Sequence, residues 1–500
     1  MLWLSRFKAI ILAFLPVAGC VTFSSEESFN QVADAVQVRL GKQISWDAGQ
    51  YEDPLVGATI GKLLSRPLTP DTAVQIALLN NRELQSTYAD LGIAQANVVQ
   101  ATLWKNPIVA GTIFFPITGG GSPDYTFDLA LRVIDIIYIP LRKRVAESEL
   151  EETKFQVTAR VMGVAGQTYL AFIDYLGERE RIGVLTRAVD SAHVIVESGK
   201  ALRKAGNITD YDFEGQVGLK VQVAAELARA RISAVEARER VNRLLGLTGP
   251  QTQWRGADRL PRVSARELFS ADAERKALEG SVDLGAVRQR LITMGRKYRV
   301  VDITSVLPRF DAGGREQRDV GEDEAGPTFA MEVALFDWGQ ARREAARMEI
   351  LKARDEFTGL TARIRSFARL QQRKLLSARQ TAIFYAETVV PQSQRLLAAA
   401  ERQYNMTQLG VFDRLQTKEK QNDEKQLGVF DLLQAKEKQI RASLEYVAAL
   451  KTYWRERARF AQILNGKLPD DADDIRGTAV ESAAQITSSM NQAASSGKQP

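Results

Sequence analysis

The chain contains one cysteine, Cys20, and one histidine, His193, among its 500 residues. A single cysteine excludes an intramolecular disulfide, and the lack of a cysteine or histidine cluster excludes the usual zinc sites. The seven methionines are scattered, so we expect no copper-binding array. After Cys20 no run of about 18 apolar residues occurs, which is the length that a membrane-spanning helix requires. If the mature chain crosses a membrane, it must do so with β-strands.

Patterns typical of an enzyme site are also lacking. Gly119–Gly121 precede an expected strand and not a helix, so they predict a loop and not a phosphate-binding turn. The pair Glu151–Glu152 is typical of a solvated helix face, and His193 lies within an expected helix as a surface or interface residue. The net charge of +6 is spread over a chain with 61 acidic residues, which does not produce a nucleic-acid-binding stripe. We therefore expect no enzyme activity, cofactor, metal centre or nucleic-acid partner.

The first 19 residues have the pattern of an export signal. Arg6 and Lys8 form a short basic region, an apolar run follows, and small residues precede Cys20. This ending resembles a bacterial lipobox, in which the cysteine becomes the first mature residue and carries acyl chains such as palmitate. The alternative is a secreted protein that loses Cys20 with the signal. By the same resemblance, Val21 in place of an aspartate favours the outer membrane.

The chain that follows has 45% hydrophobic residues, enough for a large folded core. Residues 20–66 predict a tether with little regular structure. A first structural repeat, 67–250, begins with a helix that starts near Pro70 and ends before Pro107. Two strands around a Gly-rich turn then predict a β-hairpin over 108–133. In its second strand apolar residues alternate with mostly polar ones, which gives one apolar face and one mostly polar face; the apolar residues are Tyr125, Phe127, Leu129, Leu131 and Val133.

A long helix is predicted over 142–205, because no proline and few glycines interrupt it. At 1.5 Å per residue it would be roughly 95 Å long, more than an ordinary globular core needs. A turn and a return helix complete the first repeat, and 251–270 read as a linker.

The second repeat, 271–468, follows the same plan. Ala77-Leu78 recurs as Ala277-Leu278, an offset of 200 residues. A second β-hairpin is predicted over 300–336, with strands at 300–307 and 328–336 around a polar loop. A second long helix, 338–409, should be kinked at Pro391. Residues 469–500 predict a disordered tail.

One stretch of this repeat is nearly duplicated within 408–439. QLGVFDRLQTKEKQ at 408–421 is followed by QLGVFDLLQAKEKQ at 426–439. The copies are 18 residues apart, which is five helical turns, so every later side chain keeps its original face. We hypothesise that the extra segment forms a small extension that changes partner docking. The alternative is a tandem duplication that is tolerated because it is in phase.

Four strands are too few to close a barrel, since the smallest known single-chain outer-membrane barrels have about eight. Three copies would supply twelve. The expected fold class is mainly α with a small β part: long antiparallel helical hairpins that form an α-helical tunnel, plus four transmembrane β-strands per chain that complete a 12-stranded β-barrel in a trimer. The alternative is a soluble sheet whose helices form a bundle or rod.

Four motifs then resemble the TolC-like outer-membrane efflux family, particularly its lipoprotein members. They are LGIAQANVVQATLWKNP (91–107), EVALFDWGQARREAA (332–346), RQYNMTQLGVFDRLQTKEKQ (402–421) and EYVAALKTYWRERARFAQILNG (445–466). The resemblance covers roughly 65–466. It implies a homotrimer in the outer membrane of a Gram-negative bacterium, with a tunnel through the periplasm. It also implies two partners, a periplasmic adaptor (membrane fusion) protein and an inner-membrane efflux pump.

In this family the turns of the long helices form the periplasmic tip, the channel entrance. Carried over by position, the first tip contains Gly206, Asn207 and Asp210. The second contains Tyr404, Gly410 and Asp413, with Gly428 and Asp431 as the duplicated pair. A glycine fits a helix reversal because it tolerates positive φ. The aspartates are either caps of the returning helices or a ring that attracts cations.

The function expected from these features is passive export of small molecules through the exit duct of a tripartite efflux system. One alternative is the outer-membrane component of type I protein secretion. Another is a structural coiled-coil lipoprotein without a pore, although a tether has no use for lipid-facing strands.

Overall fold

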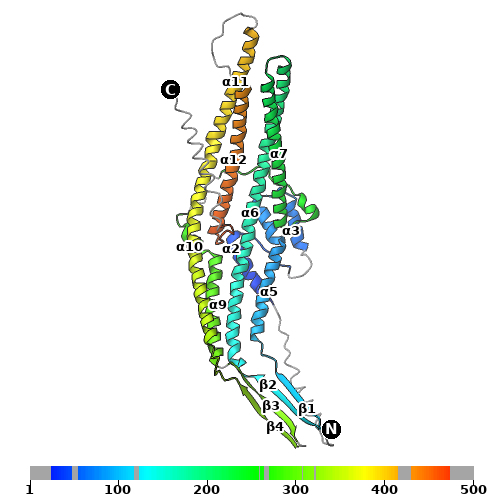
Figure 1. Cartoon of the computed structure of the whole chain (residues 1–500), viewed down its shortest axis with the longest axis vertical. Coiled ribbons are helices and arrows are strands. Elements are labelled where there is room, and N and C mark those ends of the chain that lie inside the picture. The colour runs from blue at the N-terminus through cyan, green and yellow to red at the C-terminus, as the bar shows by residue number, and fades with distance from the viewer. Residues whose placement is uncertain are drawn as a thin grey trace. The chain divides into compact units, whose positions relative to one another are not determined.

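The computed structural model describes residues 24–47, 54–117, 123–257, 259–263, 270–306, 308–319, 322–414 and 429–472. They form long helices and a four-stranded antiparallel sheet (Figure 1), which confirms the predicted, mainly α fold with a small β part. Among the helices of these ranges, none is both long and apolar enough to span a membrane. The export signal, Cys20 and most of the predicted tail lie outside the described residues.

The chain divides into two compact units. Unit 1 comprises Met1–Ala35, Ser86–Thr158 and Val282–Leu360, and unit 2 comprises Val36–Gln85, Ala159–Ser281 and Thr361–Pro500. The elements before the middle of the chain are α2 (Glu26–Leu40), α3 (Pro54–Leu64), α4 (Pro70–Asn80), α5 (Arg82–Thr102), β1 (Ile108–Phe114), β2 (Asp124–Arg132), α6 (Asp135–Lys204) and α7 (Asp210–Leu245). A short 3-10 turn, η2 (Gly249–Gln253), follows.

The second half repeats this order. Its elements are α8 (Ala273–Glu279), α9 (Val282–Val306), β3 (Phe310–Asp319), β4 (Glu322–Met331), α10 (Gln340–Phe384), the π-helical turn η3 (Tyr385–Val389), α11 (Val390–Arg414) and α12 (Val429–Leu464). Helices α5 and α9 begin at Arg82 and Val282, which are 200 residues apart, the offset between the Ala-Leu pairs of the sequence.

The sheet of unit 1 has the strand order β1-β2-β3-β4, and each neighbouring pair is antiparallel. The two hairpins are joined because β2 pairs with β3, from Tyr125 opposite Arg318 to Arg132 opposite Asp311. Helices α5, α6, α9 and α10 border a groove of about 670 Å³ in the same unit. Buried contacts such as the one between the Ser148 and Thr293 hydroxyls, 2.9 Å apart, fix α6 against α9.

One predicted hairpin boundary is wrong. Residues 300–306 form the end of α9, and the strands are β3 and β4, so the predicted polar loop itself forms β3 and the first half of β4. Tertiary pairing outweighs local propensity here, because a β-branched run fits a helix when the helix packs on neighbours. In β3, Gly313 lies where β2 passes too close for any side chain.

The prediction that residues 20–66 have little regular structure is also wrong, because this segment contains α2 and α3. In α2, Val32 and Val36 are four residues apart and almost completely buried. This i, i+4 spacing is a helical signal, but it is weak in a segment rich in polar residues.

The long helices are confirmed with shifted ends. Helix α6 runs over 135–204 instead of 142–205 and has 70 residues, with Pro140 in its first turns. The helix predicted over 338–409 consists of α10, η3 and α11. The π turn lies directly before Pro391, and the Val390 N–H donates to the Tyr385 carbonyl five residues back. Pro391 has no N–H to donate to the preceding turn, which accounts for the change of hydrogen bonding at this place.

The helix predicted from Pro70 to Pro107 is divided at Asn81, whose backbone is extended. The Asn81 side chain accepts from the Leu84 N–H and donates to the Leu244 carbonyl, 2.9 Å away. The Asn80 amide donates to the carbonyls of Leu245 and Gly246, each at 2.9 Å. The two asparagine amides between α4 and α5 therefore donate to the carbonyls at the end of α7, which have no partner within their own helix.

Candidate functional site

The reversal between α6 and α7 contains the first group of predicted site residues. Gly206 has φ +73°, the left-handed region. The Gly206 N–H donates to the Arg203 carbonyl at 3.0 Å, and the Asn207 N–H donates to the Leu202 carbonyl at 2.9 Å. These two bonds satisfy the last carbonyls of α6 and turn the chain, which is the physical reason for a glycine here.

The return helix α7 is capped by Thr209, so the cap, which was one of the two roles left open for Asp210, is excluded. The Thr209 hydroxyl accepts from the Asp212 N–H at 3.0 Å. Asp210 is the first residue of α7, where a negative charge is favourable, and its carboxylate lies 2.7 Å from Arg203 Nε. The Arg203 guanidinium also lies over the Phe213 ring, 5.0 Å from its centroid. Sequence reasoning found the glycine and missed Arg203 and Phe213, because their contacts cross the turn.

The second group of predicted residues is only partly described. Tyr404 is half-buried in α11. Gly410 and Asp413 lie inside α11, which continues to Arg414, so the helix end predicted at residue 409 is wrong by at least five residues. A glycine inside a helix costs only about 1 kcal/mol, and that allows the helix to pass through it. Residues 415–428, which include Gly428 and much of the duplicated segment 408–439, lie outside the described residues. Asp431 is exposed in the first turn of α12.

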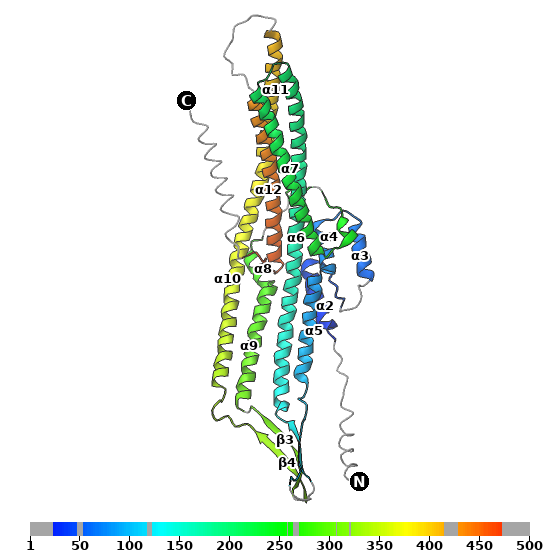
Figure 2. The same cartoon turned by 45° about the vertical axis from the view of Figure 1, so that its right-hand side comes forward.

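The described part of the second sequence copy forms the start of α12, which packs against α6 and α7 in unit 2. Leu433 lies beside Gly215 of α7, where an added Cβ would be in ordinary van der Waals contact with its methyl group, at 3.6 Å. Further along, the buried residues of this seam are Ala188, Ala192, Leu219, Val223 and Ile440. The two alanines of this seam both come from α6, and the larger apolar side chains of α7 and α12 pack against them. The pairs α6–α7 and α11–α12 are visible in both Figure 1 and Figure 2.

The sheet presents two chemically different faces. Residues that are paired across strands share a face, so the register assigns each side chain. One face carries apolar side chains, and its exposed members include Val109, Ile113, Phe329 and Met331, which are 53–81% exposed. The other face is mostly polar, with Arg315 Nε 2.7 Å from the Asp128 carboxylate and Gln317 donating to Glu324 at 2.9 Å. In β1 this face also carries the exposed side chains of Ile108 and Phe114.

The charged residues of the apolar face lie at one end. Arg318 and Asp323 are next to the turn between β3 and β4 and form an ion pair at 2.7 Å, and Glu316 lies two residues further from that turn. The rest of this face, towards the helices, is apolar. This division along the strand is typical of a surface whose centre contacts lipid and whose end contacts water.

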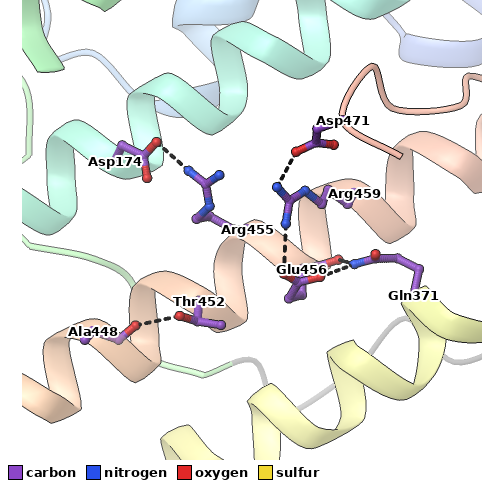
Figure 3. A network of polar contacts seen from close by, with 8 residues as sticks. All are labelled: Asp174, Gln371, Ala448, Thr452, Arg455, Glu456, Arg459 and Asp471. Atoms are coloured by element: carbon purple, nitrogen blue, oxygen red, sulfur yellow. Dashed lines mark hydrogen bonds and ion pairs between the residues drawn. The ribbon is translucent and has the colours of Figure 1, made fainter. Parts of the chain in front are cut away.

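A buried polar network holds α12 in unit 2 (Figure 3). Gln371 of α10 is 1% exposed and donates to both the backbone carbonyl and the carboxylate of Glu456, which is 6% exposed. Arg459 bridges from Glu456 to Asp471, and Arg455 pairs with Asp174 of α6. Because removal of one partner would leave a buried charge without compensation, the network fixes the position of α12.

Within the described ranges, no group of three or more His, Cys, Asp or Glu residues is close enough to hold a metal ion. His193 is exposed on α6, with its Nδ1 atom 3.2 Å from Lys220 Nζ of α7 and 3.9 Å from Glu197. The hydrogen bond from Lys200 lowers the pKa of Glu197. The histidine thus belongs to a solvated charge cluster, as the sequence predicted for a surface residue.

No protein-family model matches the chain. Among solved structures it is similar to the CmeC outer membrane channel of Campylobacter jejuni, with a TM-score of 0.64 and 14% identity over 81% of this chain and 88% of that one. It is also similar to the outer membrane protein VceC of Vibrio cholerae, with a TM-score of 0.58 and 14% identity over 84% and 98% of the two chains. The chain therefore has the fold of these outer-membrane proteins, which is the fold that the motif resemblance implied.

Among curated proteins, the chain is similar to the cobalt-zinc-cadmium resistance protein CzcC of Cupriavidus metallidurans. The two are 24% identical over 365 residues, which cover 70% of this chain and 83% of CzcC.

Proposed function

We propose that the protein is the outer-membrane channel subunit of a tripartite efflux system and that it conducts cargo passively out of the periplasm. The observation that carries the proposal is the sheet with an exposed apolar face and a polar opposite face. An exposed apolar face of this kind is unfavourable in water, because its burial contributes about 25 cal/mol per Å². The face therefore needs a lipid or a protein as its neighbour. The fold shared with CmeC and VceC supports the same role.

The proposed functional unit is a homotrimer. Strands β1 and β4 are the edges of the described sheet, and their outward backbone groups lack partners within the sheet. In lipid these groups must be paired, since no water is available. Pairing of β4 with β1 of the next copy in three chains would close a sheet of twelve strands, with the polar faces around an aqueous path.

The proposed location is the outer membrane, with the helices extending into the periplasm. Cys20 remains the proposed lipid attachment site. An adaptor protein and an inner-membrane pump are the proposed partners, because a passive duct needs an energy source elsewhere. Small molecules are the proposed cargo. Divalent metal cations are a second candidate, favoured by the similarity to a protein named for cobalt, zinc and cadmium resistance.

Electron microscopy and bilayer conductance of the detergent-extracted protein test the channel proposal together. We expect threefold particles and discrete conductance steps. In cells, loss of the protein should raise sensitivity to the cargo, so a deletion strain is compared on lipophilic drugs and on zinc, cadmium and cobalt salts. Single rods without conductance would contradict the channel proposal and favour the structural lipoprotein.

We propose that the reversal between α6 and α7 forms part of the channel entrance, with Asp210 as an exposed charge. Asp210→Asn should reduce the cation preference of the conductance. Its effect on stability should stay within about 0.5 kcal/mol, because an exposed ion pair contributes little. The matched control is Thr209→Ala, which removes the helix cap and should cost about 1 kcal/mol without changing selectivity. Reversal potentials in a salt gradient and thermal unfolding give the two readouts.

An Asp210→Asn channel with unchanged reversal potential and a large loss of stability would contradict this role. Asp210 would then be important for folding only.

A further inference from the structure

The two repeats place equivalent residues in unit 1 at a constant offset of 200. Helices α5, α6, α9 and α10 lie there in a row, with α5 and α10 at its two ends (Figure 2). Every residue that lines the groove along this row has its equivalent 200 residues away in the same lining, as Arg142 has Arg342 and Glu149 has Glu349. Helix α5 therefore corresponds to α9, and α6 corresponds to α10.

We propose that α10 of one copy of this chain packs against α5 of the next copy, in the way that α6 packs against α9 within the chain. This contact rests on the homotrimer proposed above and supplies its helical part. The sheet has the same arrangement, because β2 of the first repeat pairs with β3 of the second and leaves β4 and β1 as edges. The rotation that brings β4 to the next β1 would also bring α10 to the next α5.

The centre of the α6–α9 contact has an apolar equivalent at the two ends of the row. Ser148 of α6 and Thr293 of α9 are 0% exposed, and their hydroxyls are 2.9 Å apart. Their equivalents are Met348 of α10 and Ile93 of α5, which are 47% and 60% exposed. The same two positions are thus buried in one pair of helices and bare in the other. Contact between Met348 and Ile93 of the next copy would remove both apolar side chains from water.

The sizes of the neighbouring side chains are exchanged in a compensating way. Within the chain the long Gln289 side chain of α9 donates to the small Ser148 hydroxyl at 2.9 Å. The equivalent of Gln289 is Ala89, which is exposed on α5. The small Ala89 would therefore face the large Met348, where the large Gln289 faces the small Ser148. Such an exchange keeps the total volume of a helix contact nearly constant, which is what close packing requires.

The charges of a second pair of positions are also exchanged. Burial raises the pKa of the Glu152 carboxyl on α6, and the positive charges of Arg290 and Lys297 on α9 oppose this rise. The equivalents of Glu152 and Arg290 are Lys352 and Asp90, both exposed. Each sign is reversed, so the two positions still carry opposite charges. Opposite charges at both ends of the row favour a second copy of the chain as the partner.

A third pair keeps a donor opposite a carboxylate. The Lys297 ammonium of α9 lies 2.8 Å from the Glu149 carboxylate of α6. The equivalents are Asn97 of α5 and Glu349 of α10, and both are exposed. The Asn97 amide of one copy could donate to the Glu349 carboxylate of its neighbour, a hydrogen bond that the ionised acceptor strengthens.

Cysteine cross-linking of the full-length protein in membranes tests the contact. The double variant Ile93→Cys with Met348→Cys is oxidised with copper phenanthroline and run on a non-reducing gel. We expect covalent dimers and trimers that a reductant returns to monomers, because the two Cβ atoms would lie within reach of a disulfide. Each single variant is run beside it, which also controls for Cys20. The matched control pairs Ile93→Cys with Arg347→Cys, since Arg347 is exposed beside Met348 but points about 100° away on α10. It should lack the trimer band.

Charge reversal is an independent test that needs no oxidant. Asp90→Lys and Lys352→Asp should each lower the fraction of trimer in a detergent extract by about threefold, because each would place like charges opposite each other. The double variant restores opposite charges and should restore the trimer. Circular dichroism shows whether each variant is folded.

These results separate the contact from the channel proposal. The contact is overturned if the two cysteine pairs cross-link equally or not at all, or if the double reversal assembles no better than the single ones. Threefold particles of the unchanged protein in electron microscopy would in that case leave the channel proposal standing. Monomeric particles of the unchanged protein would overturn both.

Discussion

Replacing Gly313 by valine is expected to lower the yield of assembled protein at least about tenfold. In the sheet, a Cβ at this position would overlap the backbone carbonyl oxygen of Leu129 in β2. The overlap involves backbone and not a flexible side chain, so β3 must move away from β2. Forced overpacking typically costs 1–3 kcal/mol, and about 1.4 kcal/mol corresponds to a factor of ten. Because β2–β3 pairing joins the two hairpins, this loss affects the whole sheet.

The matched control is Gly314→Val at the next residue. A Cβ at this position would be 3.9 Å from the Gly326 carbonyl oxygen, which is an ordinary contact, and no other atom of the described residues beyond its chain neighbours would lie within 4 Å. We expect assembly close to that of the unchanged protein, measured as the amount recovered in the oligomer peak of a detergent extract. Equal recovery of the Gly313 and Gly314 variants would show that assembly does not require the β2–β3 pairing of this structure.

The features that sequence predicted well are those that repeat over short distances. Alternation of Tyr125, Phe127, Leu129 and Leu131 predicted β2 and its apolar face, because a strand places every second residue on one side. The long uninterrupted run after residue 142 predicted α6, because nothing in it stops a helix. Both signals are local, so neither depends on what the segment contacts.

The features that sequence missed depend on partners elsewhere in the chain. Residues 310–319 read as a polar loop, yet they form β3 because β2 and β4 pair with them on both sides. Conversely, residues 300–306 have strand-like composition and form the end of α9. The register of β2 against β3 spans almost two hundred residues of sequence, and no local pattern contains it.

The candidate site shows the same division. Gly206 was predicted because a helix reversal requires positive φ, which is a local demand. The sequence left open whether Asp210 caps α7, because Thr209 and Asp210 are both capping residues, and only the position at which α7 begins distinguishes them. In the second reversal, Gly410 lies within α11, so glycine alone did not locate the turn. The network around Glu456 had no sequence signal, since its members come from three separate segments.

Replacing Gly246 by alanine is expected to destabilise the protein by about 2–5 kcal/mol. Gly246 ends α7 with φ +66°, and a left-handed backbone costs a non-glycine residue about 1–2 kcal/mol. In addition, a Cβ at this position would lie 2.5 Å from the Asn80 carbonyl oxygen. To relieve that contact, α4 must move away from the end of α7, and this movement would break the hydrogen bonds from the Asn80 amide. The overpacking adds about 1–3 kcal/mol to the cost.

The comparison with Gly206→Ala separates the two costs. Gly206 has nearly the same backbone conformation, φ +73°, but apart from its chain neighbours no described residue has an atom within 4 Å of an added Cβ. Its replacement should cost only about 1–2 kcal/mol for the backbone conformation, so in thermal unfolding the Gly246 variant should melt below the Gly206 variant. Equal melting temperatures would mean that α4 does not restrain α7 through Asn80.

The equivalent position in the second repeat is Gly466, where a Cβ would overlap the Gly280 carbonyl oxygen. Gly466→Ala should therefore behave like Gly246→Ala. A large effect at Gly246 and Gly466 and a small one at Gly206 would therefore identify the helix-end contacts in both repeats as a shared structural requirement.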